Sequence, residues 1–464
     1  MTNELLRIDV GHLCSEKKTP NGITAKELNA LSSKYEKPFQ EFQEKLKAGQ
    51  YPITLSLEET NAVKHYKTLA QQLSTRYENV LIIGIGGSAL GAKAILQYLK
   101  GPFYNLEKHS TPRIFVLDNL DPVLVKKLEE LLDIRKTVLI YVSKSGSTPE
   151  TAANFIHFYN KYREAGGNVQ DLVIMCDPGD NGLNRIAQRL GCHHLPIPRS
   201  LPGRYSVLSC VGFLPAEIAG IDSAQLLAGA QQMHQAICQL PAAQNGLFAL
   251  GMALSELANR GRKIHVMFNY SSMLFEFGLW FMQLWAESLG KKNSLDHQVV
   301  HTGTTPLACT GATDQHSLLQ LFKEGPADKV FGFLKVEQLP EIVLANEFPS
   351  EKEYAYFAGH SLAEQLHIEQ LSTEMSLVRT GHPCYLITLR DNSPACLGAL
   401  FYFYEALVIF TAQLWNINPF DQPGVEEGKN ITYAMLGRED YASSRPQHTQ
   451  DIEKHNQARK VFKV

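Results

Sequence analysis

The sequence predicts an α/β fold of two doubly wound parallel-sheet domains, and three observations carry this prediction. Apolar runs of strand length are followed by polar or glycine-rich turns and then by long helical patterns, at four places along the 464 residues. The runs are continuous rather than alternating, which is typical of parallel strands buried on both faces. These strand–turn–helix units form an early pair and a late pair, so two sheets are expected.

The early pair starts with a strand at residues 79–83, which turns at GIGGS into the helical run AKAILQYL. A strand at 138–142 turns through SKSGST into the helix TAANFIHFYNKY. Apolar runs at 114–117 and 172–175 fit additional strands of the same sheet.

The late pair starts with a strand at 264–267, which turns at NY into the helical run SMLFEFGLWFMQLWAESL. A strand at 385–389 turns at DNSP into the apolar stretch 395–415. That stretch approaches the about 20 residues that span a bilayer, but Glu405 at its centre is costly in lipid. It is therefore predicted to be a buried core helix.

The length of the chain leaves room for two large domains with decorated ends, at roughly 150 residues per domain. We place the break between them near residues 221–245, where the pattern turns helical and rich in Ala and Gln. The expected parts are an N-terminal extension (1–50), a first α/β domain (51–230), a second α/β domain (231–420) and a C-terminal segment carrying Lys429 (421–464).

The composition is that of an ordinary globular protein, with 44% hydrophobic and 20% charged residues. Forty-four Lys and Arg against 47 Asp and Glu give a net charge of −3. A chain without a strong positive field has no general attraction for nucleic acid or anionic membrane, so neither is an expected partner. An anionic ligand must be bound by local groups.

The eight cysteines are scattered and include no C-x-x-C pair, which predicts reduced thiols. Cys192-His193-His194 is the one thiol–imidazole cluster, and it lacks a second ligand pair at zinc spacing, so no metal site is expected. The N-terminal residues MTNELLRIDVGHL are too polar for a signal peptide. These features together predict a cytoplasmic protein.

A glycine-rich turn, Gly84-x-Gly86-x-x-Ala89, matches the relaxed dinucleotide-binding fingerprint. The acidic residue expected about 20 positions later is not clearly present, since Asp118 comes 34 residues after Gly84. Three interpretations stay open: a tight βα turn, a nucleotide-dependent dehydrogenase, or a nest of backbone donors for another anion. The pattern favours the nest.

A hydroxyl-rich loop, residues 143–148 in the segment SKSGSTPET, follows a predicted strand and precedes a predicted helix. Its hydroxyls, its lysine and the free N–H groups of the helix start suit the oxygens of a phosphate monoester. The alternative is a simple helix cap by Thr148 with Pro149 at the first helical position. One hydroxyl would satisfy that alternative, so four favour phosphate binding.

Glu287 lies near the end of a helix expected at 272–291 that is otherwise apolar nearly all round, with Gln283 four residues earlier on the same face. Such a glutamate is either a solvated terminal charge or, where the helix end opens into a cleft, a general base. Arg204, His316 and Lys429 stand in loop-like or helix-start contexts, and each is an ordinary residue when taken alone.

Six blocks in order resemble the glucose-6-phosphate isomerase (phosphoglucose isomerase) family over most of the chain, from about Leu81 to Lys429. The blocks are GIGGSALG, SKSGSTPET, PGRYSVLS, NYSSMLFEFGLWFMQLWAESLGKK, DQHSLLQLFKEGP and NPFDQPGVEEGK. The resemblance implies two sugar-isomerase (SIS) αβα domains with N- and C-terminal extensions. It also implies reversible conversion of D-glucose 6-phosphate to D-fructose 6-phosphate through a cis-enediol, a step of glycolysis and gluconeogenesis.

The resemblance also assigns roles to single residues. It implies that Glu287 moves a proton between C2 and C1 and that Arg204 offsets the charge of the enediolate. His316 and Lys429 would help to open the sugar ring, with the histidine supplied by the neighbouring subunit of a homodimer. The remaining family positions that contact substrate correspond to Gly87, Ser88, Ser143, Lys144, Ser145, Thr148, Gln283 and Gln422.

The chemistry implied needs neither a redox cofactor nor a metal, and its expected partners are a sugar phosphate and a second copy of the chain. Two further alternatives stay open besides the dehydrogenase named above. One is an isomerase that also accepts mannose 6-phosphate, and the other is a catalytically silent sugar-phosphate sensor. The sensor is disfavoured because no DNA-binding segment or basic patch accompanies the candidate catalytic residues.

Overall fold

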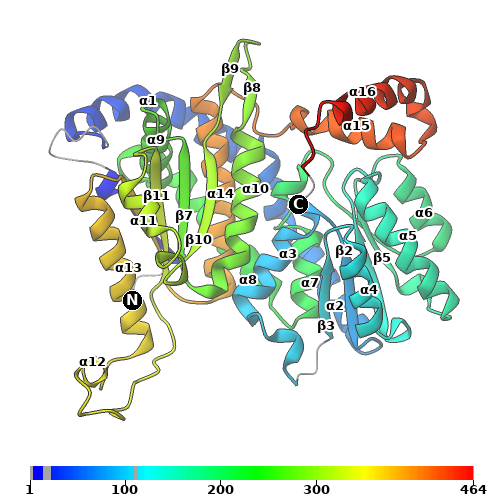
Figure 1. Ribbon diagram of the computed structural model, residues 1–464, viewed down its shortest axis with the longest axis horizontal. Helices are drawn as coiled ribbons and strands as arrows, with labels where there is room; N and C mark the ends of the chain where they lie inside the picture. Colours follow the sequence, from blue (N-terminus) through cyan, green and yellow to red (C-terminus); the bar gives the residue numbers. More distant parts are fainter. Residues whose placement is uncertain (1–3, 14–21, 109–111, 463–464) are drawn as a thin grey trace. The chain divides into compact units, whose positions relative to one another are not determined.

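The computed structural model describes residues 4–13, 22–108 and 112–462, and the chain divides into two units, 1–419 and 420–464. The first unit holds two five-stranded sheets with helices on both faces of each (Figure 1). This arrangement is the predicted α/β class with two doubly wound parallel sheets. The predicted four-part division is finer than these two units and stays a prediction.

The first sheet is parallel throughout, in the order β3-β2-β4-β5-β6. Every residue of β2, β4 and β5 is buried, which explains why their sequences are continuous apolar runs. Helices α4, α5 and α6 pack their apolar side chains on one face. The strands are β2 (Asn79–Ile83), β3 (Arg113–Leu117), β4 (Thr137–Val142), β5 (Val173–Cys176) and β6 (His193–Pro196).

The second sheet has the order β10-β7-β11-β12-β1, in which only β1 is antiparallel. The edge strand β1 comes from the predicted N-terminal extension, so part of that extension belongs to the second sheet. Helices α11 and α13 pack on one face, and α10 packs on the other (Figure 1). The strands are β1 (Leu6–Asp9), β7 (Ile264–Tyr270), β10 (Thr305–Thr310), β11 (Lys329–Val336) and β12 (Cys384–Leu389).

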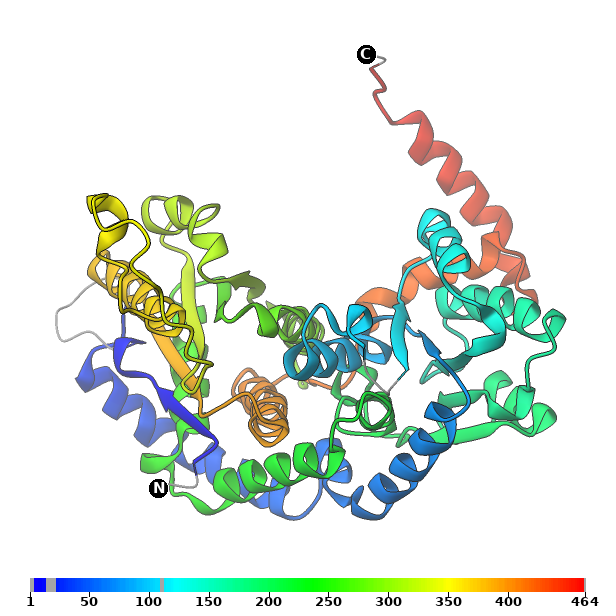
Figure 2. The same cartoon turned by 90° about the horizontal axis from the view of Figure 1, so that it is seen from below.

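The long apolar helix α14 (Pro394–Leu414) is the centre of the first unit, where it packs against α8, α9 and α10. Its N-cap residue is Ser393, whose side chain accepts a hydrogen bond from the backbone N–H of Cys396, and Pro394 occupies the first helical position. Its most apolar 18-residue window is 94% buried inside the protein. The prediction of a core helix is confirmed, and Figure 2 shows α14 nearly end-on among its neighbours.

The other helices of the first unit surround the sheets and α14. A short antiparallel hairpin, β8 (Lys291–Asn293) with β9 (Val299–Thr302), follows α10. The helix predicted at 272–291 is shorter than expected, because a 3₁₀ turn precedes it and Lys291 already belongs to β8. These helices are α1 (Ala25–Lys47), α2 (Thr60–Ser74), α3 (Leu90–Lys100), α4 (Pro122–Leu131), α5 (Pro149–Glu164), α6 (Gly182–Leu190), α7 (Cys210–Ile218), α8 (Ser223–Gln239), α9 (Gly246–Asn259), α10 (Phe275–Leu289), α11 (Leu319–Glu324), α12 (Lys352–Ala355) and α13 (Leu362–Arg379).

The second unit, residues 420–464, is a small helical segment. It contains α15 (Glu426–Met435) and α16 (Arg445–Gln457), joined by a 3₁₀ turn at Glu439–Ser444. Arg438 lies over the rings of Tyr433 and Tyr441, at 4.6 and 5.3 Å from their centroids. These cation–π contacts hold the turn between the two helices.

Candidate active site

The strand order of the first sheet reverses direction between β2 and β4, and the region at the carboxyl ends of these two strands is named the crevice, after the ligand-binding crevice expected at such a switch point. The chain leaves β2 toward β3 on one side, and β4 lies on the other side, so the loops after β2 and β4 diverge. Open α/β sheets bind their ligands at such switch points. The glycine-rich turn (84–88) and the hydroxyl-rich loop (143–148) are the two loops that border this crevice.

The hydroxyl-rich loop gathers its side chains on one another rather than on the helix that follows. Thr148 is the N-cap residue of α5, but its side chain makes no capping hydrogen bond. Its Oγ1 lies 3.3 Å from Ser143 Oγ and 3.3 Å from Ser145 Oγ. This geometry favours an anion-binding loop over a simple helix cap, because the hydroxyls remain grouped beside the N-terminus of α5.

Lys144 extends this loop with a positive charge in a confined place. Burial lowers the pKa of Lys144; nearby Asp177 acts against that shift, while the charge of Arg204 adds to it. The hydroxyl-rich loop and Arg204 therefore lie within electrostatic reach of each other, although 60 residues of sequence separate Lys144 from Arg204.

The glycines of the turn after β2 are explained by close packing. A Cβ on Gly87 would lie 2.2 Å from the Gly203 carbonyl oxygen and 2.6 Å from the Arg204 nitrogen. A Cβ on Gly86, whose φ is +56°, would lie 2.7 Å from Gln283 Nε2. The turn thus needs glycine to bring the Gly203–Arg204 turn and helix α10 against it. The N–H of Ser88 is already bonded to Ile85, so this turn offers fewer donors than a dinucleotide nest.

Glu287 lies at the C-terminal end of α10, where three polar groups meet. Its Oε1 accepts a hydrogen bond from Gln283 Nε2 at 3.0 Å, and its Oε2 lies 3.3 Å from Arg204 Nη1. The Glu287 side chain is 32% exposed, whereas that of Arg204 is 1% exposed. A partly accessible carboxylate beside a buried cation can take a proton from a ligand while the cation offsets negative charge on that ligand.

Three groups that the sequence did not point to hold Arg204. The Ser288 hydroxyl and the Pro419 carbonyl oxygen accept hydrogen bonds from Arg204 directly. The Tyr205 hydroxyl contacts both of these acceptors and so holds Arg204 indirectly. Tyr205 lies in the PGRYSVLS block and Ser288 directly follows Glu287, but neither residue type signals catalysis. Only adjacency to predicted site residues could have drawn attention to them.

His316 does not join Glu287 within one chain. Trp285, on α10, donates a hydrogen bond to Thr304 at the start of β10, and Gly278 faces Ala308 farther along that strand. The carboxylate-bearing end of α10 therefore lies at the amino end of β10. His316 follows the carboxyl end of the same strand, where it is exposed. A six-residue strand spans roughly 20 Å, so the two side chains lie at opposite edges of the sheet.

Lys429 and Gln422 belong to the second unit. Lys429 lies on α15, and its Nζ is 2.9 Å from Glu426 Oε1. Gln422 precedes the 3₁₀ turn Pro423–Val425. Their predicted roles stay predictions, as do the individual roles of the other site residues.

The Cys192-His193-His194 cluster, at which no metal site is expected, lies beside a further thiol, that of Cys176. Cys176 Sγ lies 3.4 Å from His194 Nε2, and burial raises the pKa of both Cys176 and Cys192 to about 11. Over residues 4–13, 22–108 and 112–462, no three His, Cys, Asp or Glu side chains are grouped so that they could hold a metal ion. The seven cysteines in these ranges are free thiols, and Cys14 lies outside them.

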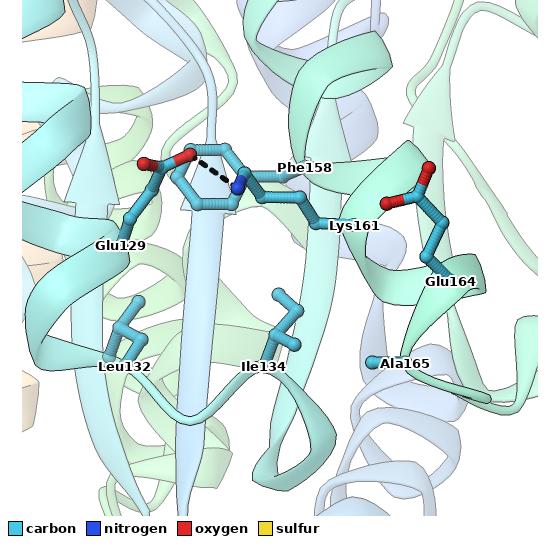
Figure 3. Close-up of a pocket in the computed structure, with 7 residues that line it drawn as sticks. All are labelled: Glu129, Leu132, Ile134, Phe158, Lys161, Glu164 and Ala165. Atoms are coloured by element: carbon cyan, nitrogen blue, oxygen red, sulfur yellow. Dashed lines mark ion pairs between the residues drawn. The ribbon is translucent and has the colours of Figure 1, made fainter.

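A separate pocket of about 320 Å³ lies between α4 and α5, away from the crevice (Figure 3). Its apolar floor includes Leu132, Ile134 and Phe158, and an ion pair of 2.9 Å joins Glu129 to Lys161 at its rim. Its α5 residues come from the C-terminal half of that helix, whereas the hydroxyl-rich loop precedes the first turn. The pocket therefore contributes nothing to the crevice.

Two doubly wound sheets define the α/β class of this protein, and its candidate site combines a hydroxyl-rich loop with a carboxylate–guanidinium pair. The sequence profile described as phosphoglucose isomerase matches residues 68–453. A glucose-6-phosphate isomerase from Carboxydothermus hydrogenoformans is 34% identical over 92% of this chain and 91% of its own length. A glucose-6-phosphate isomerase from Rubrobacter xylanophilus is 38% identical over 77% of this chain and 82% of its own length. The chain belongs to the phosphoglucose isomerase family.

Solved structures agree with the fold. A structure described as a hypothetical protein from Thermus thermophilus has a TM-score of 0.80 and 31% identity, and the match covers 93% of this chain and 100% of that one. A glucose-6-phosphate isomerase from Chlamydia trachomatis has a TM-score of 0.77 over 94% of this chain and 90% of its own; at 22% identity it supports the fold alone. The resemblance and the fold class expected from the sequence are both confirmed.

Proposed function

We propose that this chain is a glucose-6-phosphate isomerase that interconverts D-glucose 6-phosphate and D-fructose 6-phosphate in the cytoplasm. The observation that carries the proposal is the contact of 3.3 Å between Glu287 and Arg204, in a member of this family, within electrostatic reach of a loop suited to phosphate. The reaction moves one proton between two carbons, which requires a base and a stabiliser of negative charge.

In the proposed proton transfer, Glu287 removes the C2 proton of the open-chain aldose and returns it to C1. The Gln283 amide holds one carboxylate oxygen at 3.0 Å, which orients the carboxylate for that transfer. Arg204 lies beside the carboxylate, where its charge offsets the enediolate that forms when the proton leaves. O1 gains a hydrogen and the C2 hydroxyl loses one as the carbonyl shifts from C1 to C2, so the atoms balance and the product differs from the substrate only in the positions of two hydrogens.

The phosphate of the substrate anchors it in the crevice. Ser143, Ser145 and Thr148 supply hydroxyls that already lie together, and Lys144 supplies charge. Because the phosphate is remote from C1 and C2, its binding energy orients the reacting carbons rather than taking part in the chemistry. Gly87, Ser88 and Gln422 complete the proposed substrate contacts.

Ring opening comes first, because the substrate is largely cyclic, and we assign it to His316 and Lys429. The positions of His316 and Glu287 at opposite edges of one sheet support supply of the histidine by a second copy. The carboxyl edge that bears His316 also carries the long connection 337–361, whose exposed apolar side chains suit a subunit interface. They are Ile342, Val343, Phe348, Tyr354 and Tyr356. The proposed active form is therefore a homodimer.

The test is proton NMR in heavy water with purified protein, fructose 6-phosphate and no added cofactor. We expect glucose 6-phosphate carrying deuterium at C2, because the base exchanges its proton with solvent. Glu287→Gln should slow this conversion by at least about 1,000-fold while retaining saturable binding of the sugar phosphate.

The other outcomes are equally informative. Mannose 6-phosphate signals in the same tube would extend the substrate range, because both epimers share one enediol. Saturable line broadening without any turnover would replace the proposal by a sugar-phosphate sensor. Full activity of Glu287→Gln would leave the proposed isomerase function in place but show that Glu287 is not its base.

A further inference from the structure

Ser288 is a fully buried hydroxyl at the rear of the Arg204–Glu287 pair. Its Oγ accepts hydrogen bonds from Arg204 Nε at 2.8 Å and from the Tyr205 hydroxyl at 2.9 Å. The side chains of the same two residues also approach the Pro419 carbonyl oxygen, which lies 2.6 Å from Arg204 Nη2 and 3.4 Å from Tyr205 Oη. We name these three groups, Ser288, Tyr205 and the Pro419 carbonyl, the arginine clamp.

The clamp fixes the plane of a guanidinium. A hydroxyl has two acceptor lone pairs, and Ser288 presents both of them to donors, so rotation of Arg204 about its Nε breaks a buried hydrogen bond. Ser288, Tyr205 and Arg204 are all almost wholly buried, at 0%, 0% and 2% exposure, so water does not replace a lost bond there.

The clamp also determines how Arg204 meets Glu287. An unrestrained guanidinium and carboxylate commonly form a bidentate pair at about 2.7–2.9 Å. Here Nε and Nη2 are directed to the clamp, and Nη1 lies 3.3 Å from Oε2 of the carboxylate. The base is therefore not neutralised by a tight ion pair, while the cation stays beside the place where substrate charge develops.

We propose that Ser288 and Tyr205 are positioning residues that hold Arg204 for the enediolate and keep it from collapsing onto Glu287. The inference rests on the proposed isomerase function. It predicts that loss of the clamp weakens binding of a charged enediolate mimic much more than binding of an uncharged one, because only the former senses the guanidinium. A merely structural hydroxyl would affect both ligands equally.

The chain supplies a matched control. Ser255 is also a buried helical serine, and its hydroxyl accepts a hydrogen bond of 2.8 Å from Trp415 Nε1, away from the crevice. Ser255→Ala removes a buried acceptor from one nitrogen donor, whereas Ser288→Ala removes an acceptor shared by Arg204 Nε and the Tyr205 hydroxyl. Both variants should lose stability in thermal unfolding, Ser288→Ala the more, but only Ser288→Ala should change the chemistry.

The experiment measures kcat, KM and the dissociation constants of two probes for the full chain and its variants. D-Arabinonate 5-phosphate places a carboxylate where the enediolate carries its charge, whereas D-glucitol 6-phosphate is uncharged at C1 and C2. For Ser288→Ala we expect kcat to fall about 10- to 100-fold and arabinonate 5-phosphate to bind at least about 10-fold more weakly, with glucitol 6-phosphate within about 3-fold of wild type.

Tyr205→Phe removes one hydroxyl and leaves Ser288 on Arg204, so it should show the same selective pattern at smaller size and serves if Ser288→Ala does not fold. Equal weakening of both probes, or no weakening of either, in a folded variant would overturn the clamp. Absence of turnover and of probe binding in the wild type would instead overturn the proposed isomerase, so the two failures are distinguishable.

Discussion

The two sheets of the first unit share one strand order but use opposite edges. In the first sheet β3 lies on one side of β2, and β4, β5 and β6 follow on the other side. In the second sheet β10 lies on one side of β7, and β11, β12 and β1 follow on the other side. The fifth position is taken by a parallel strand in one case and by the antiparallel N-terminal strand in the other. Equal topology therefore does not imply equal function.

The difference lies in the loops and helix ends. The first sheet contributes short loops at its carboxyl edge, and in the proposed function these hold the phosphate. The second sheet contributes Glu287 from the far end of α10, a 15-residue helix that extends roughly 22 Å. Its own carboxyl edge carries the exposed His316. In the proposed homodimer, that edge supplies His316 to the site of a second copy.

The largest expected effect tests whether the second edge serves another subunit. His316→Ala should lower kcat by at least about 100-fold, because ring opening loses its acid–base group. In a heterodimer with Glu287→Gln on the other chain, one shared site carries both changes and the other carries neither. Verified heterodimers should then show about half the wild-type activity in a coupled isomerisation assay.

The parental homodimers provide the control for this mixing experiment, since each has a defect at both of its sites. Heterodimers that stay as inactive as their parents would show that each chain supplies its own histidine. That result would break the proposed contrast between the two edges.

The next effect compares one glycine from each sheet. Gly87→Ala drives a Cβ to 2.2 Å from the Gly203 carbonyl oxygen, which displaces Arg204, so kcat should fall about 100-fold. Gly332→Ala drives a Cβ to 2.2 Å from the Tyr385 hydroxyl in the core of the second sheet. It should lower the free energy of unfolding by about 1–3 kcal/mol with kcat unchanged. Steady-state kinetics and chemical denaturation on both variants separate the two effects.

A smaller effect tests the hydroxyl-rich loop. Thr148→Val removes a hydroxyl that lies 3.3 Å from each of two others but makes no helix-capping bond. We expect KM for fructose 6-phosphate to rise about 10-fold, with a smaller change in stability. If inorganic phosphate and fructose 6-phosphate bind the variant as they bind the wild type, the loop does not hold the phosphate.

The smallest effect concerns stability and pH at the second edge. Partial burial acts to raise the pKa of Asp391, but hydrogen bonds from Ser393 and Arg390 lower it to about 2. A carboxyl whose pKa is depressed on folding stabilises the protein above its unfolded pKa of about 3.8, and that stabilisation is lost as the pH falls toward 2. Asp391→Asn should remove about 1–2 kcal/mol at neutral pH and flatten the stability profile between pH 4 and 2, as measured by urea unfolding. Its kcat should equal that of wild type.

Strands buried on both faces were predictable, whereas strands with mixed composition were not. The runs at 79–83 and 264–267 coincide with β2 and with the start of β7, because every apolar residue there except the partly buried Ile264 is buried. The strand β6 begins with two histidines and alternates in burial at the sheet edge, so no apolar run marked it. The strand β1 is four residues long and is stabilised by pairing with β12, which local sequence does not reveal.

The candidate site was predictable residue by residue but not as a geometry. Family blocks pointed to Glu287, Arg204 and the hydroxyl-rich loop, which the fold brings within reach of one another. The clamp formed by Ser288, Tyr205 and the Pro419 carbonyl had no sequence signal. A backbone carbonyl has no residue identity, and a serine hydroxyl is informative only once its partners are known.

The sequence by itself determined the local elements of this protein. Hydrophobic periodicity and turn chemistry act over ten to twenty residues, so the strands buried on both faces, the buried helix α14 and the hydroxyl-rich loop follow from the local sequence. Tertiary structure decided which of these elements and side chains contact one another. Arg204 reaches Glu287 across 83 residues and the Pro419 carbonyl across 215, and the length of β10 separates Glu287 from His316. Such contacts depend on how sheets and helices pack, and packing is a property of the whole core.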